Sequence, residues 1–172
     1  LETIKAYRDA QAPTAELVHN QIWYSPKTTD VYRGIDAADY LNLERGFLDN
    51  GIVSGTGTFG LETFLIHIDD LHSRGKKIVF DTSRRTMTNA QFEYTKAAYL
   101  LVKEDGDLLG LDDLSRMAPD TYDTSLDVDI GTALNTWYKT SEQGQTAYRR
   151  DFTGGYVYIF DAPNKVGAIV TG

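Results

Sequence analysis

Hydrophobic positions recur at helical spacing in several parts of the chain. Apolar residues of 61–73 and 89–102 repeat every three or four positions, the period of a helix that packs one face on a core. Weaker spacing over residues 2–24 predicts two short helices, and further helices are expected over residues 36–48 and 132–148.

Other stretches have the composition of strands. Residues 30–34 predict a short buried strand that ends at a glycine, and residues 76–80 predict a strand that runs into Asp81-Thr82-Ser83. The run Tyr-Val-Tyr-Ile-Phe at 156–160 is strongly β-prone, and a last apolar run ends at Val170. The chain therefore mixes helices with strands.

The length of 172 residues fits one domain with a single core. Within it, residues 1–29 are expected to be a helical N-terminal addition. Residues 103–150 are expected to be an insertion, because their first part is acidic and broken by glycine and proline.

Composition narrows the possible functions. Hydrophobic residues make up 41% of the chain, and no apolar run approaches the roughly 20 residues of a membrane-spanning helix, so no membrane span is expected. A net charge of -8 argues against a nucleic-acid partner, which needs clustered lysine and arginine. The chain has no cysteine, which excludes disulfides and thiolate chemistry.

No metal site is expected. His67 and His72 are five positions apart on a predicted helix, whereas zinc ligands on a helix prefer a spacing of four. The aspartates of residues 120–129 do not match the spacing of a calcium-binding loop.

Two groups of residues carry candidate chemistry. Arg33 lies at the end of a predicted buried strand, and its planar guanidinium could bind a pyrophosphate or a ribose in bidentate fashion; the alternative is a salt bridge to a nearby carboxylate. Thr82 and Ser83 place two hydroxyls at another strand end, where they could hold a ribose; the alternative is a turn or a helix cap.

Taken in order, the motifs resemble those of mono-ADP-ribosyltransferases of the cholera and pertussis toxin type. Val-Tyr-Arg-Gly at 31–34 is similar to the family's first-strand arginine motif, and residues 37–47 are similar to the helix that follows it. Phe-Asp-Thr-Ser at 80–83 resembles the Ser-Thr-Ser strand, with aspartate in place of the first serine. Residues 155–164 are similar to the tyrosine-rich strand and Ala-Pro-Asn turn.

The resemblance implies an α+β fold in which two small antiparallel sheets form an NAD cleft with flanking helices. It implies that Arg33 holds phosphate and ribose, that Thr82 and Ser83 support the nicotinamide ribose, and that Tyr32 and Gly34 line the approach. The expected reaction transfers ADP-ribose from NAD to an acceptor, such as a protein side chain, and releases nicotinamide. A secreted toxin that acts in the host cytosol is the implied setting.

The family's Glu-x-Glu signature, expected after the tyrosine-rich strand, does not occur before Gly172. Glu93 is interpreted as a solvated helix residue and Glu142 as a loop residue, since both precede that strand. We therefore expect the chain to be the N-terminal fragment of a longer or split enzyme, with the catalytic glutamate on a companion chain. The alternative is a catalytically inactive protein-binding module.

Overall fold

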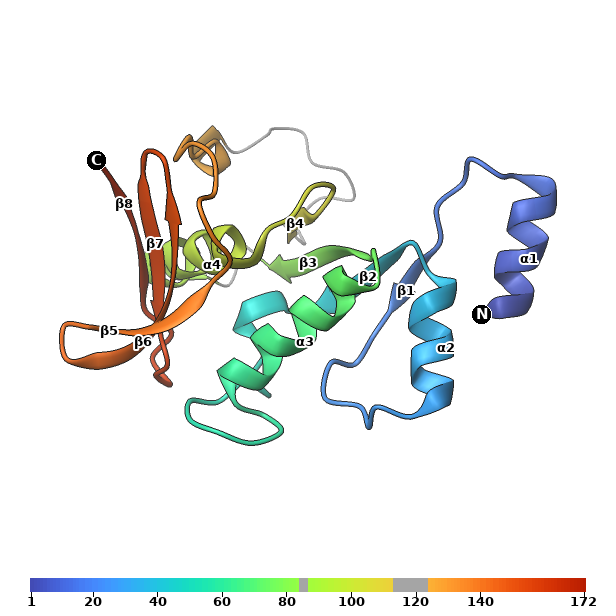
Figure 1. Ribbon diagram of the computed structural model, residues 1–172, viewed down its shortest axis with the longest axis horizontal. Helices are drawn as coiled ribbons and strands as arrows, with labels where there is room; N and C mark the ends of the chain where they lie inside the picture. Colours follow the sequence, from blue (N-terminus) through green and yellow to red (C-terminus); the bar gives the residue numbers. More distant parts are fainter. Residues whose placement is uncertain (84–86, 113–123) are drawn as a thin grey trace.

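The structure of the protein is a computed structural model that describes residues 1–83, 87–112 and 124–172 (Figure 1). Its helices are α1 (Glu2–Gln11), α2 (Thr29–Ala37), α3 (Leu61–Ser73) and α4 (Asn89–Val102), with short 3₁₀ turns η1 (Gly46–Leu48) and η3 (Thr124–Leu126). Its strands are β1 (Val18–Asn20), β2 (Tyr40–Glu44), β3 (Lys77–Ser83), β4 (Leu108–Asp112), β5 (Tyr138–Glu142), β6 (Gln145–Phe152), β7 (Gly155–Phe160) and β8 (Gly167–Thr171).

The first half of the chain forms a parallel sheet. Strands β1 to β4 pair side by side in chain order, and each pair is parallel. Parallel neighbours need a crossover between them, and here α2, α3 and α4 supply one crossover each. The carboxyl ends of all four strands therefore lie at one edge of the sheet.

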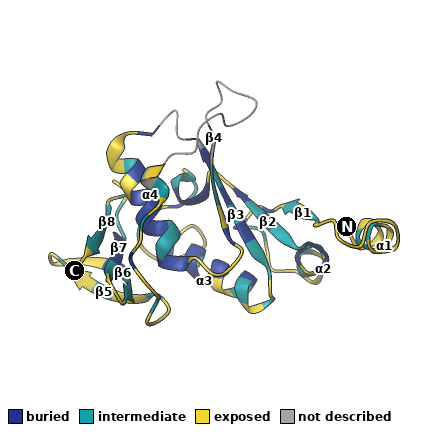
Figure 2. Ribbon diagram, turned by 90° about the horizontal axis from the view of Figure 1, so that it is seen from above, coloured by how far each residue is buried: buried dark blue, intermediate teal, exposed yellow. Residues whose placement is uncertain are grey.

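The second half forms an antiparallel meander in which β5 to β8 pair in order. Helix α4 lies between this sheet and the parallel one, and it packs against β7 and β8 (Figures 1 and 2). The protein is therefore a mixed α and β structure with two small sheets. The expected pair of antiparallel sheets is wrong for the first sheet, which is parallel.

Burial alternates along the central strands. Leu41 and Leu43 of β2 are buried, as are Ile78, Phe80 and Thr82 of β3, and Phe80 stacks on Phe47 with ring centroids 5.2 Å apart. This face of the sheet carries the core that α3 and α4 complete (Figure 2).

The opposite face of the parallel sheet is more exposed. Asn42 and Val79 are half-buried there, and the flanking strands expose 54% of Val18 and 52% of Leu108. All-parallel sheets are normally covered on both faces, so this second face is unusually open among the described residues.

Helices α3 and α4 begin and end where the apolar spacing predicts. Thr88 caps α4 by accepting a hydrogen bond from the Gln91 backbone N–H, and the Gln91 side chain accepts one from the Thr88 N–H. The strands predicted at residues 76–83 and 156–160 and the final apolar run are also confirmed, as β3, β7 and β8.

The strand expected at residues 30–34 is wrong, because these residues form helix α2. Thr28 accepts a hydrogen bond from the Val31 N–H at 3.3 Å, and Asp30 lies in the first turn, so the segment begins with a helix cap. The helix then buries Ile35 and Ala37. A five-residue apolar pattern was too short to separate the two structures.

Two expected helices are also strands. Residues 36–48 contain β2, whose alternating leucines are buried by the sheet. Residues 132–148 contain β5 and the start of β6, joined at Gln143 and Gly144, which both have positive φ values (51° and 77°) as a tight hairpin turn requires. The turn residues, not the apolar spacing, were the informative signal there.

The expected division of the chain changes accordingly. Residues 1–29 contain one helix and the edge strand β1, so they are not simply a helical addition. The insertion expected at residues 103–150 contributes β4, β5 and much of β6, while residues 113–123 lie outside the described part of the chain.

Asp107 connects the amino-terminal end of β3 with helix α3 and with the end of helix α4. Its buried carboxylate accepts hydrogen bonds from the backbone N–H groups of Ile78 (2.8 Å) and Glu104 (3.0 Å) and pairs with His72 Nε2 at 2.9 Å. Burial alone would lower the pKa of His72, but the hydrogen bond and charge of Asp107 outweigh it and raise that pKa.

We expect Asp107→Asn to lower the free energy of unfolding by about 3 kcal/mol, because the amide cannot accept all three hydrogen bonds and leaves buried groups unsatisfied. Chemical denaturation measures the change. Asp36→Asn, at an exposed ion pair with Arg74, is the control and should have a much smaller effect. Equal effects of the two changes would contradict this role of Asp107.

His67 is a second buried histidine, on α3, and it is neutral. Burial and the neighbouring charge of Lys27 lower its pKa to about 4, against an opposing effect of Asp70. Lys27 Nζ contacts its Nδ1, and its Nε2 has no partner in the described structure.

The lowered pKa of His67 predicts acid sensitivity. Between pH 6.5 and about 4, His67 binds a proton in the unfolded chain but not in the folded one. The free energy of unfolding therefore falls over this range, by up to about 3 kcal/mol. We expect His67→Gln to flatten this part of the curve of unfolding free energy against pH. If the variant and the wild type have the same slope between pH 6.5 and 4, His67 is protonated in the folded protein and the predicted shift is absent.

Candidate functional site

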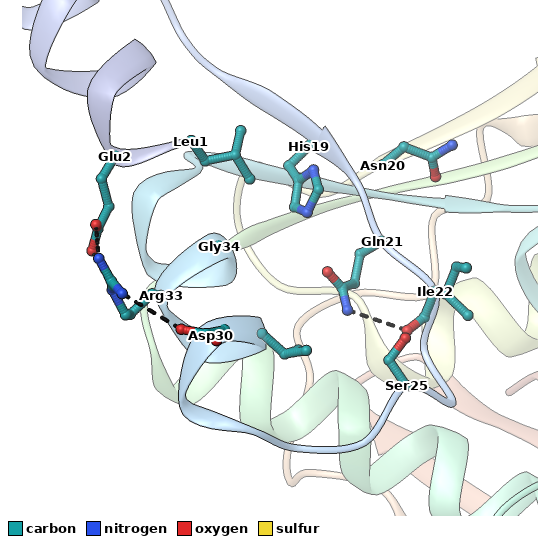
Figure 3. Close-up of a pocket in the computed structure, with 11 residues that line it drawn as sticks. Leu1, Glu2, His19, Asn20, Gln21, Ile22, Ser25, Asp30, Arg33 and Gly34 are labelled. Carbon is teal, nitrogen blue, oxygen red and sulfur yellow. Dashed lines mark hydrogen bonds and ion pairs between the residues drawn. The ribbon is translucent and has the colours of Figure 1, made fainter.

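Arg33 lies on the exposed side of α2 and pairs with carboxylates. Its Nε donates to Glu2 Oε1 at 2.9 Å, and its Nη1 approaches Asp30 at 3.5 Å (Figure 3). The salt bridge to Glu2 ties α1 to α2. The structure thus has the salt-bridge arrangement that the sequence left open as the alternative.

The other residues of the expected arginine motif are also part of this helix. The ring of Tyr32 is half-buried beneath the Arg74 guanidinium, whose Cζ lies 3.9 Å from the ring centroid. Gly34 and Arg33 line a pocket of about 480 Å³ between α1, α2 and the segment that follows β1 (Figure 3).

Thr82 and Ser83 lie elsewhere. Thr82 is buried in β3 with the core-facing residues, and Ser83 is the last residue of that strand. No described residue of β3 lines the Arg33 pocket. Arg33 therefore does not lie on a strand next to β3, and its pocket does not include Thr82; the Ser83 side chain lies outside the described part of the structure. That NAD contacts the expected site residues stays a prediction; these are Tyr32, Arg33, Gly34, Thr82 and Ser83.

Polar side chains do converge at the carboxyl edge of the parallel sheet. Glu44 ends β2 and is in direct register with Asp81 of β3, so the two carboxylates project from the same face of adjacent strands. Strands in a sheet lie about 4.8 Å apart. Asn20, which ends β1, donates from Nδ2 to Glu44 Oε1 at 2.7 Å. Three neighbouring strands thus each contribute a polar side chain.

A pocket of about 310 Å³ adjoins Glu44. Its lining comes from the segments that follow β1 and β2 and includes Asn20, Trp23, Tyr24, Glu44 and Arg45. Trp23 is buried, and its indole N–H has no hydrogen-bond partner in the described structure. The exposed ring of Tyr24 therefore lies in the same pocket as the Glu44 carboxylate, a combination that suits a small polar ligand.

The chain turns sharply directly after Glu44. Arg45 has φ 63° and Gly46 has φ 47°, so two successive residues adopt the left-handed region that a non-glycine residue rarely occupies. The turn allows Phe47 to reach Phe80 in the core. Left-handed non-glycine residues cost free energy and concentrate at functional sites.

Other candidates from the sequence have structural roles. Glu93 is confirmed as an exposed helix residue and pairs with Lys96 at 2.8 Å. Glu142 pairs with Arg149 at 3.2 Å and is the last residue of β5, not of a loop. The described residues include no group of three side chains suited to hold a metal ion. No described helix is both long and apolar enough to cross a bilayer.

Sequence reasoning missed the cluster at Asn20, Glu44 and Asp81. Residues 36–48 were interpreted as a helix, which hid the strand that ends at Glu44. The available signal was the alternation of Tyr40 to Glu44, followed by a charged pair and a glycine.

Comparison with known proteins adds no identification. No known family model matches this chain, and no curated protein matches it.

Two glycine substitutions test the local structure on which this site depends. Gly34→Ala should raise the free energy of unfolding by roughly 0.5–1 kcal/mol, because alanine favours a helix and its Cβ would meet Leu1 Cδ1 at 3.5 Å and His19 Nε2 at 3.8 Å, which are ordinary contacts. Gly46→Ala should lower it by about 1 kcal/mol, because φ is positive there. Thermal or chemical denaturation measures both, and effects of the same sign would contradict the assigned conformations.

Proposed function

We propose that the protein acts on a glycosidic bond, with Glu44 and Asp81 as the catalytic carboxylates. The observation that supports this proposal is their side-by-side position at the carboxyl ends of β2 and β3. Enzymes that break glycosidic bonds use a pair of carboxyl groups that flank the bond.

The place of the pair in the fold favours a functional role. Parallel sheets bind their ligands at the carboxyl ends of the strands, both in open sheets and in closed β/α barrels. Here the four strands follow the chain order in an open sheet, and Glu44 and Asp81 lie at their carboxyl ends.

The chemistry needs two different carboxyl groups. One donates a proton to the leaving oxygen or nitrogen, while the other attacks or stabilises the positively charged sugar carbon. In retaining enzymes the two carboxyl groups are about 5 to 5.5 Å apart. The amide of Asn20 fixes the orientation of Glu44.

The neighbouring pocket suits a sugar ring. Tyr24 is 43% exposed and provides aromatic surface, and its ring meets that of the buried Trp23 edge to face with centroids 5.5 Å apart. Aromatic faces pack well against the C–H groups of a sugar.

ADP-ribosyl transfer from NAD is the second candidate, since it also breaks a glycosidic bond. It is favoured by Asp81-Thr82-Ser83, the segment similar to the family's Ser-Thr-Ser strand, which ends β3 at the same edge as Glu44. In that version Glu44 supplies the carboxylate that was expected on a companion chain. An inactive binding module is the remaining alternative.

Substitution of each carboxylate tests the proposal. Glu44→Gln and Asp81→Asn should each reduce turnover at least 100-fold, because each removes a proton donor or a charge that the transition state needs. Release of nitrophenol from a panel of nitrophenyl glycosides and release of nicotinamide from NAD measure turnover, and they separate the two candidates.

Glu16→Gln is the matched control, because Glu16 pairs with Lys77 far from the cluster in the fold and should leave turnover unchanged. Turnover that survives in both carboxylate variants would refute the assignment. A wild-type protein that turns over no substrate of either kind would favour the inactive module.

A further inference from the structure

Arg45 differs from the other arginines that the structure describes. Arg8, Arg33, Arg74 and Arg149 each form an ion pair with at least one carboxylate. Arg150 donates to backbone carbonyls, including that of Lys103 at 2.8 Å. For Arg45 no hydrogen bond, ion pair or ring contact occurs within the described structure, although the protein carries 25 acidic residues against 17 basic ones.

The position of this unpaired arginine is fixed by the fold. It follows Glu44 directly, it lines the pocket beside that carboxylate, and its left-handed backbone is held by the turn that sends Phe47 into the core. Asp49 lines the same pocket, but its Oδ1 accepts the Gly51 N–H at 2.7 Å instead of pairing with Arg45. A strained backbone thus presents a guanidinium that has no ion-pair partner within the described structure.

We propose that Arg45 is a specificity-determining residue that binds an anionic group of the substrate. A guanidinium pairs with phosphate or carboxylate oxygens in bidentate fashion, and its charge is permanent. It sits one residue beyond the carboxylate that acts on the bond. The anionic group would therefore lie next to the sugar that is cleaved. This inference rests on the proposed function and narrows its substrates to anionic glycosides.

Two kinds of anionic substrate share this chemistry. A phosphate-bearing one, such as NAD, presents a pyrophosphate close to its ribose. A uronic acid presents a carboxylate on the sugar itself. We expect one of these two anionic substrates to bind through Arg45. The affinity for a neutral sugar serves as the reference.

Binding measurements on the full chain test the proposal. Isothermal titration with ADP-ribose, glucuronic acid and glucose should show that one anionic probe binds and that glucose binds at least tenfold more weakly. Arg45→Met should weaken the anionic probe at least about tenfold and leave glucose unchanged, because it removes a charge-assisted contact but keeps the length of the side chain. Arg149→Met, at an arginine that pairs with Glu142 and Asp151 in the antiparallel sheet, is the matched control and should bind like the wild type.

Each outcome decides the proposal. Loss of ADP-ribose binding in Arg45→Met identifies a phosphate as the anionic group, and loss of glucuronic acid binding identifies a carboxylate. Equal binding by Arg45→Met and wild type, or no preference of the wild type for either anion over glucose, would overturn it. Circular dichroism confirms that the variants are folded.

The experiment also separates this inference from the proposed function. Glu44→Gln should abolish turnover while anion binding persists, because the substitution leaves Arg45 in place. Anion binding through Arg45 with turnover unaffected by Glu44→Gln would retain the binding site and reject the catalytic roles. Turnover that depends on Glu44 but not on Arg45 would retain the catalytic role of Glu44 and reject the anion-binding role of Arg45.

Discussion

The parallel pairing of β2 with β3 is the constraint on which the rest of the structure depends. Its register places Leu41, Leu43, Ile78 and Phe80 on one face, where α3 and α4 close a core. Because side chains alternate, the same register puts Glu44 and Asp81 together on the other face. A shift of one residue would bury the carboxylates and expose the core, so the energetics of packing also fix the geometry of the candidate site.

The two ends of this sheet have different roles. At the amino-terminal end, Asp107 satisfies two backbone N–H groups and holds His72, so its charge is fully used in joining β3 to the α4–β4 connection. At the carboxyl end, Asn20, Glu44 and Arg45 are exposed, and Arg45 pairs with no carboxylate in the part of the chain that the structure describes. Groups that are satisfied by the protein stabilise it, whereas groups left unsatisfied at a strained turn are available to a ligand.

Long apolar patterns were predictable and short ones were not. The helices at 61–73 and 89–102 follow from three turns of regular spacing, and the strands at 77–83 and 155–160 from dense apolar runs. Residues 31–34 carry too few positions to show a period, so the cap at Thr28 decided the structure. The error moved the candidate site as well, because an arginine on a strand end faces a ligand edge while an arginine on α2 faces Glu2.

Arg45, not Arg33, is the arginine at the end of a strand. It follows the last residue of β2, has no partner within the described structure and adjoins a carboxylate, whereas Arg33 lies on α2 and pairs with Glu2. The position of Arg45 at a strand end could be recognised only once β2 was known. Since register alone brings Asp81 beside Glu44, no local motif in the sequence could have joined the three charged groups.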